Sequence, residues 1–238
     1  MDDAEQSHAE SRGPVPIRDR PGLFWFELRR WVRNRSRLVS ERSGEFTHGE
    51  ISERSRQLDD LWDTTWAGVS PAGHILRRTH PSRSVRLHSL PGGKRYADTE
   101  AEHAEVVRRH RTVLADLLGD ATNETLVVLA TDYGRRDLMT GWTRSALPDA
   151  WPWRRFSGSV DEDEAPSFVW VQTGVTESHL DTLLRLIADD GGSLVLAGPQ
   201  VDWVYCPYDG GVDVILPGAD ERDLLASRYA DWLPQDQT

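Results

Sequence analysis

The sequence contains a single cysteine, Cys206, among 238 residues. An intramolecular disulfide is therefore impossible, and so is a zinc site built from several cysteines. A lone cysteine in a strand-like stretch most often acts as a small buried hydrophobe, and we expect this role for Cys206. A nucleophilic thiol is the functional alternative, but nothing around Cys206 in the sequence supports it.

Long apolar runs are also missing. No stretch of about 18 apolar residues occurs, so we expect no helix that spans a membrane. The chain begins MDDAEQSHAESRG, which is polar and acidic and lacks the apolar centre of a signal peptide. The sequence therefore predicts a soluble, cytoplasmic protein.

The sequence has fewer basic than acidic residues: 28 Lys and Arg against 39 Asp and Glu, which gives a net charge of −11. This balance disfavours a general attraction to nucleic acid or to an anionic membrane. It favours a protein partner with a basic surface, because complementary charges steer association.

The well-known catalytic and cofactor motifs are absent. The sequence has no Gly-x-Ser-x-Gly elbow, no Gly-x-Gly-x-x-Gly after a strand, no His-Glu-x-x-His and no Walker phosphate loop. We therefore predict no cofactor and no metal, and the sequence leans away from an enzyme without excluding one.

What the sequence does contain is a distinctive hairpin pattern in residues 201–216, VDWVYCPYDGGVDVIL. Two strand-like runs flank Asp209, Gly210 and Gly211, and Asp-Gly between such runs is a strong signal for a tight primed turn. Asp at the first position of a turn is common because its side chain bonds the backbone ahead.

The remaining pattern alternates helices and strands. Residues 99–118 form the clearest helix, with a Thr-x-x-Glu capping box at Thr99 and Glu102 and Gly119 at its end. The run TLVVLAT at 125–131 is typical of a central strand covered on both faces. Strands are expected at 84–90, 167–173 and 193–197, and helices at 49–66, after Thr176 and after an Asp220 cap. Residues 134–166 are expected to form a long, partly packed loop.

These elements predict one α/β or α+β domain with a mixed sheet, a C-terminal antiparallel meander and helices packed on it. Residues 1–22 are predicted to be a disordered tail and residues 23–57 a helical, basic extension. A basic run in this extension is either a solvated helix face or a contact for nucleic acid: Arg29, Arg30, Arg33, Arg35 and Arg37.

Two polar loops define a candidate cleft. The segment PGGKRY at 91–96 has small residues before two cations, which suits either a phosphate-cradling loop or an ordinary turn. The carboxylates Asp209 and Asp213 flank the glycine turn and are structural, ligands for Ca²⁺ or Mg²⁺, or an acid–base pair. If the two loops meet, the cleft contains His88, Lys94, Arg95, Tyr96, Tyr208, Asp209 and Asp213.

Two histidines lie on or beside the apolar stripe of the helix at 99–118. His103 and His110 are seven residues apart, which places them about 10 Å apart along the helix axis. One metal ion cannot bind both directly, so we expect partly buried, hydrogen-bonded histidines.

Several motifs together resemble a bacterial family of hypothetical proteins that is grouped as a domain of unknown function. The motifs are LWD at 61–63 with Trp66 and His74, VRLHSLP at 85–91 with KRY at 94–96, RH at 109–110 with VL at 113–114, PYDGGVDVI at 207–215 and DWL at 231–233. The resemblance covers roughly residues 58–234 and implies no activity, cofactor or catalytic residue. It does imply that residues 1–57 are an addition to the common core.

The first functional hypothesis is a non-catalytic protein-binding domain, regulatory or immunity-like. The second is an enzyme that acts on a phosphate- or nucleotide-containing ligand in the candidate cleft. The third is nucleic-acid binding through the basic run at 29–37.

Overall fold

The computed structural model describes residues 53–133, 139–156, 167–189 and 191–235. The predictions for residues 1–52, including the tail and the basic run, lie outside these ranges. The acidic run at 161–164 lies outside them as well.

The fold is built on one seven-stranded sheet with the strand order β1-β7-β6-β5-β2-β4-β3. All of its strand pairs are antiparallel, so the expected mixed sheet is corrected in this respect. The strands are β1 (Ser84–His88), β2 (Val127–Tyr133), β3 (Trp151–Phe156), β4 (Ser167–Gln172), β5 (Leu194–Ala197), β6 (Val204–Tyr208) and β7 (Gly211–Ile215).

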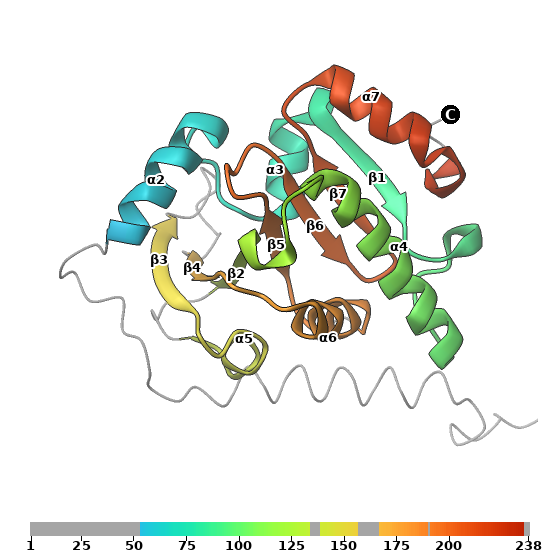
Figure 1. The fold of residues 1–238 in the computed structure, drawn as a ribbon, viewed down its shortest axis with the longest axis horizontal. Coiled ribbons are helices and arrows are strands. Elements are labelled where there is room, and N and C mark those ends of the chain that lie inside the picture. The colour runs from blue at the N-terminus through green and yellow to red at the C-terminus, as the bar shows by residue number, and fades with distance from the viewer. Residues whose placement is uncertain (1–52, 134–138, 157–166, 190, 236–238) are drawn as a thin grey trace, which may run out of the picture.

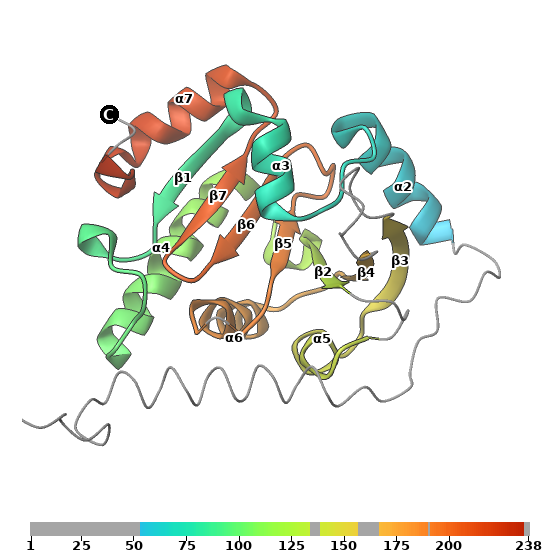
Figure 2. The ribbon, with the colours of Figure 1, turned by 180° about the vertical axis from the view of Figure 1, so that it is seen from behind.

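Helices cover both faces of the sheet, as the α/β or α+β prediction requires (Figure 1). They are α2 (Glu53–Trp66), α3 (Gly73–Thr79), α4 (Glu100–Leu118), α5 (Gly141–Ala146), α6 (Glu177–Ala188) and α7 (Ala219–Arg228). The larger core lies under α4 and α6, and the smaller core lies under α2 and α3. Figure 2, seen from behind, shows α3 across β6 and β7. Helix α7 runs beside β1 at one edge of the sheet.

Strand β2 occupies the interior position that its continuous apolar run predicts. It pairs with β5 on one side and with β4 on the other, and residues 127–130 are all buried. The strand extends two residues further than expected, through Asp132 and Tyr133.

The hairpin at 201–216 is confirmed as β6 and β7, with Tyr208 opposite Gly211 across a two-residue turn. Gly210 has a φ of 97°, whereas Asp209 is not among the described residues with positive φ. The turn is therefore not the primed type I′ turn expected from Asp-Gly, which needs positive φ at both positions.

Helix α4 follows its sequence signals closely. The side chain of Thr99 accepts a hydrogen bond from the Glu102 amide, and the Glu102 carboxylate accepts one from the Thr99 amide. Gly119 ends the helix with a φ of 57°. By contrast, α7 is capped by Gly218, and Asp220 lies inside its first turn, which corrects the expected Asp220 cap.

The predicted loop at 134–166 is wrong in two places, because it contains helix α5 and strand β3. Thr140 caps α5 by accepting a hydrogen bond from the Thr143 amide. Strand β3 is an edge strand with Pro152 and a register shift next to it, and such a strand lacks clean alternation.

Helix α2 begins at Glu53, before the predicted core boundary at residue 58. Its Trp62 and Trp66 are fully buried in the smaller core. Trp62 lies edge-on to Trp153 of β3, with ring centroids 5.5 Å apart. The helix is therefore packed against the sheet as an integral layer.

Candidate functional site

The two polar loops of the predicted cleft are in direct contact. Arg95 donates a hydrogen bond from Nε to the Asp209 carboxylate at 2.7 Å, and its guanidinium lies 5.2 Å from the Tyr96 ring centroid. A Cβ on Gly210 would lie only 3.0 Å from the Arg95 Cα, so a side chain there would push the loops apart. The 91–96 loop therefore packs on the tip of the β6–β7 hairpin.

Asp213 forms a second ionic cluster further along β7. It lies directly opposite Arg86 in the β1–β7 register, and Arg86 donates Nε and Nη2 hydrogen bonds of 2.8 and 3.1 Å to its two oxygens. Arg77 of α3 approaches the same carboxylate from above the sheet at 3.3 Å. The Asp213 side chain is 6% exposed, so the two arginines compensate the burial of this carboxylate.

Tyr208 and His88 flank Gly211 in adjacent strands at the same end of the sheet. The Tyr208 hydroxyl lies 2.8 Å from the position of a Gly211 Cβ, so only glycine leaves room for this ring. The Arg86 guanidinium lies 5.3 Å from the centre of the Tyr208 ring. Burial raises the pKa of the Tyr208 phenol to about 12, so it is protonated at neutral pH.

Lys94 turns away from this group. Its ammonium forms ion pairs with Glu102 at 2.5 Å and with Asp98 at 2.9 Å, at the N-terminus of α4. The Lys94 side chain therefore ties the glycine loop to the capping box of α4.

The structure thus divides the seven predicted residues into three places. Asp213 lies in the middle of β7 beside Arg77 of α3, and Lys94 lies at α4. The others lie at or beside the hairpin tip: His88, Arg95, Tyr96, Tyr208 and Asp209. Arg77 and Arg86 were missed as site residues. Strand alternation places Arg86 on the face of His88 and could have indicated it, whereas Arg77 depends on how α3 docks.

A buried network on the other face of β1 joins Ser89, His110 and Tyr205. The His110 ring lies 3.0 Å from the Ser89 hydroxyl through Nε2 and 2.6 Å from the Tyr205 hydroxyl through Nδ1. Burial lowers the pKa of His110 to about 4, so the imidazole is neutral. His103 bonds the Thr99 carbonyl and Asp189. The expectation of hydrogen-bonded histidines is confirmed for both.

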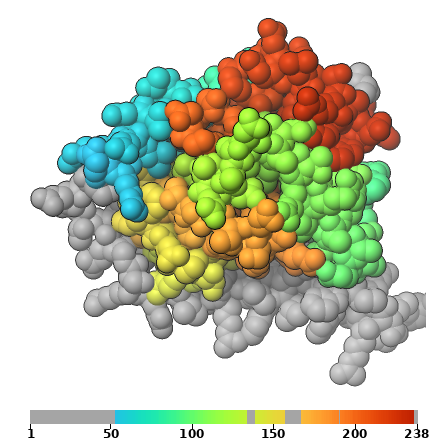
Figure 3. Space-filling model, viewed as in Figure 1, coloured from blue at the N-terminus to red at the C-terminus, as the bar shows by residue number. Residues whose placement is uncertain are grey.

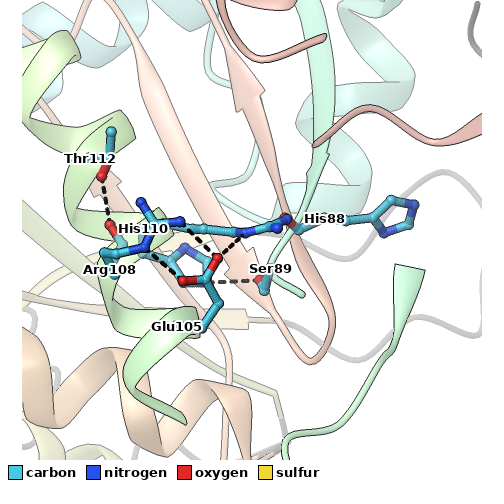
Figure 4. A network of polar contacts seen from close by, with 7 residues as sticks. His88, Ser89, Glu105, Arg108, His110 and Thr112 are labelled. Carbon is cyan, nitrogen blue, oxygen red and sulfur yellow. Dashed lines mark hydrogen bonds and ion pairs between the residues drawn. The ribbon is translucent and has the colours of Figure 1, made fainter. Parts of the chain in front are cut away.

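Figure 4 shows the contact between Ser89 and His110 beside a second set of polar contacts along α4. Glu105 accepts hydrogen bonds from Arg108 and from the buried Arg109, and Arg109 also donates to the His88 carbonyl. These arginines lower the pKa of Glu105 to about 2. The His88 ring points away from Ser89 and His110, which separates it from the buried network (Figure 4).

Two other side chains, Cys206 and Asp132, have structural roles. Cys206 is buried in β6, and burial raises the pKa of its thiol, so the expected apolar role is confirmed. Asp132 accepts hydrogen bonds from the amide and hydroxyl of Thr140 and from the hydroxyl of Thr143, which ties β2 to α5.

A groove of about 520 Å³ lies between the C-terminal half of α4, the 3-10 turn Asn123–Thr125 and the start of α6. Its apolar lining includes Leu114, Leu118 and Leu180. Figure 3 views the face on which α4, in green, and α6, in orange, lie side by side.

The rim of this groove is acidic. Glu124 and Glu177 line it, together with Arg111. Arg111 pairs with Glu177 at 2.9 Å and with Asp181 at 3.3 Å, so one cation faces two of the acids. The Oδ1 atom of Asp181 is buried and has no hydrogen-bond donor among the described residues.

Comparison with protein families matches residues 72–237 to a family described as a domain of unknown function (DUF3885). The match covers well over half of the chain, so the protein belongs to this family. It confirms the resemblance to a domain of unknown function, and the match begins at residue 72, after the part of the resemblance at 61–66. Neither curated proteins nor solved structures gave a match.

Within the described ranges, no three His, Cys, Asp or Glu side chains are grouped so that they could hold a metal ion. A search of the same part of the chain found no helix with the length and apolarity needed to cross a bilayer.

Proposed function

We propose that this protein is a bacterial, cytoplasmic binding domain that acts on another protein, in a regulatory or immunity-like role, by receiving a basic segment of that partner. The observation that carries the proposal is the groove between α4 and α6, which combines an apolar lining with an acidic rim. A segment with arginine or lysine beside an apolar anchor matches both features.

The charges around the groove favour a cationic occupant. Arg111 is shared by Glu177 and Asp181, and Glu124 adds a further negative charge to the lining. The net charge of −11 adds long-range attraction for the same kind of partner.

The use of the predicted cleft residues also supports a binding role. Asp209, Asp213 and Lys94 each have an ion-pair partner, and these pairs join loops, strands and helices to one another. Side chains in such ion pairs stabilise the fold. A general acid or base must instead face a substrate, so these ion pairs favour a binding role over a catalytic one.

The test uses the full chain with a photo-crosslinking residue in place of Asn123, expressed in the native host. We expect one basic protein to be cross-linked at this position. The purified partner should then bind the wild type with an affinity that falls as salt rises. The double variant Glu124→Lys/Glu177→Gln should bind at least about tenfold more weakly, because it reverses one negative charge of the rim and removes the other.

The matched control is Glu53→Lys/Asp60→Gln, which makes the same change in charge at exposed positions on α2. Equal weakening by the control would show that only overall charge matters and would overturn the groove as the site. A cross-link from residue 123 to residues 23–38 of the same chain would also overturn the proposal, because the basic occupant would then be internal.

A further inference from the structure

Arg77, Arg86 and Asp213 form a cluster with an excess of positive charge in an otherwise acidic protein. Two guanidinium groups share one carboxylate, which leaves one positive charge uncompensated. The other carboxylate of the hairpin, Asp209, is already paired with Arg95. The cluster is therefore electrostatically suited to an anion.

The geometry holds the two arginines in place while leaving them accessible. Arg86 is fixed by its two-point contact with Asp213, and Arg77 reaches the same carboxylate from α3. The Arg86 side chain remains 30% exposed and the Arg77 side chain 42% exposed. An arginine has five N–H donors, and the contacts with Asp213 use only one on Arg77 and two on Arg86.

Two neighbours add to this arrangement. The Tyr208 hydroxyl is protonated at neutral pH and lies on the same side of the sheet, beside Arg86. His88 is the next residue on this face of β1. The guanidinium groups of Arg77 on α3 and Arg86 on β1 suit a tetrahedral anion, because each guanidinium can donate hydrogen bonds to different oxygens of the anion.

From these contacts we propose that Arg77 and Arg86, oriented by Asp213 and assisted by Tyr208, bind the phosphate group of a small phosphorylated ligand. The site lies beside α3, on the face of the sheet opposite to α4 and α6. It is therefore separate from the proposed protein-binding groove (Figure 2). Asp213 is a positioning residue, because it acts through the arginines.

Calorimetric titration of the full chain with inorganic phosphate and with a nucleoside monophosphate tests this proposal, in chloride of constant ionic strength. We expect saturable binding of both. Tighter binding of the nucleoside monophosphate than of inorganic phosphate would identify the ligand as a nucleotide. Equal affinities would show that the site recognises the phosphate group alone. No saturable binding of either probe in the millimolar range would overturn the proposal.

Variants of α3 provide the residue test. Arg77→Gln leaves the Arg86–Asp213 pair intact, so the fold should persist while phosphate binding weakens about tenfold or more. Arg77→Lys keeps the positive charge but lacks the planar guanidinium that can donate two parallel hydrogen bonds. Its affinity for phosphate should therefore lie between those of the wild type and Arg77→Gln. Arg78→Gln removes an exposed charge from the next position and should bind like the wild type. Unchanged binding by Arg77→Gln, or equal loss in Arg78→Gln, would overturn the site.

Discussion

His110 is held as a neutral imidazole, because burial in the larger core lowers its pKa to about 4. In the unfolded chain an ordinary histidine has a pKa near 6.5. Between these two pKa values the unfolded chain binds a proton that the folded chain does not. The stabilisation from neutral His110 is therefore complete above about pH 6.5 and is lost as the pH falls through 4.

We predict that the free energy of unfolding of the wild type falls steeply between pH 7 and pH 4, with His110 contributing on the order of 3 kcal/mol. His110→Gln should be less stable at pH 7, because the amide fits Ser89 and Tyr205 less well, but its stability should depend less on pH. Urea unfolding at several pH values measures both.

The matched control for this experiment is His74→Gln, at an exposed position on α3. It should follow the wild-type pH profile. A profile for His110→Gln that runs parallel to the wild type would contradict the assignment of the acid sensitivity to His110.

At the scale of single residues, the sequence predicted the roles of individual side chains better than it predicted which side chains pair with each other. Cys206 as a buried hydrophobe and His110 as a hydrogen-bonded histidine followed from their local patterns. The ion pair between Arg86 and Asp213 joins residues 127 positions apart, and it depends on the register of β1 against β7. No local pattern fixes such a register.

Among the secondary-structure elements, α4 connects the 91–96 loop with the core. Its capping box joins Thr99 and Glu102, and Lys94 reaches the same Glu102. The cap therefore stabilises both the first turn of the helix and the loop that contacts the hairpin tip.

We predict that Thr99→Ala lowers the free energy of unfolding by about 1 kcal/mol, because it removes the side-chain oxygen that satisfies the Glu102 amide. Thr122→Ala is the control, because the Thr122 side chain makes no capping hydrogen bond at its own helix end. Urea denaturation of both variants provides the comparison. Equal losses would contradict a specific contribution from the cap.

Elements with strong caps and clear periodicity were predictable, and irregular ones were not. Helices α4 and α6 have Thr caps and apolar residues at helical spacing. Strand β3 has Pro152 and a bulge at the sheet edge, and its tryptophans pack on α2 instead of alternating cleanly. Its pairing with β4 supplies the stability that its local sequence does not show.

At the scale of the whole molecule, helix α2 lies before the residues that match the family, 72–237, yet it covers part of the sheet. The Trp62 indole donates to the Val69 carbonyl at 2.7 Å, and the Trp66 indole donates to the Val201 carbonyl at 2.8 Å. The second bond and the burial of both rings connect α2 with the family core, whereas the first joins α2 to the segment that follows it.

We predict that Trp62→Ala lowers the free energy of unfolding by about 3–5 kcal/mol, as expected when a large buried aromatic is truncated. Thr64→Ala, at an exposed position of the same helix, should change it by less than about 0.5 kcal/mol. Thermal and chemical unfolding of the full chain measure the difference. Similar values for the two variants would mean that α2 does not stabilise the core.

The sequence by itself determined the class of fold, the β6–β7 hairpin, the capped helix α4 and the family, because these depend on local periodicity, turn residues and short motifs. Only the tertiary structure decided the antiparallel order of the sheet, the division of the predicted cleft residues and the positions of Arg77 and Arg86 beside Asp213. The physical reason is that strand register and helix docking come from contacts between residues far apart in the chain. The energies of those contacts are spread over whole faces of the sheet and its helices.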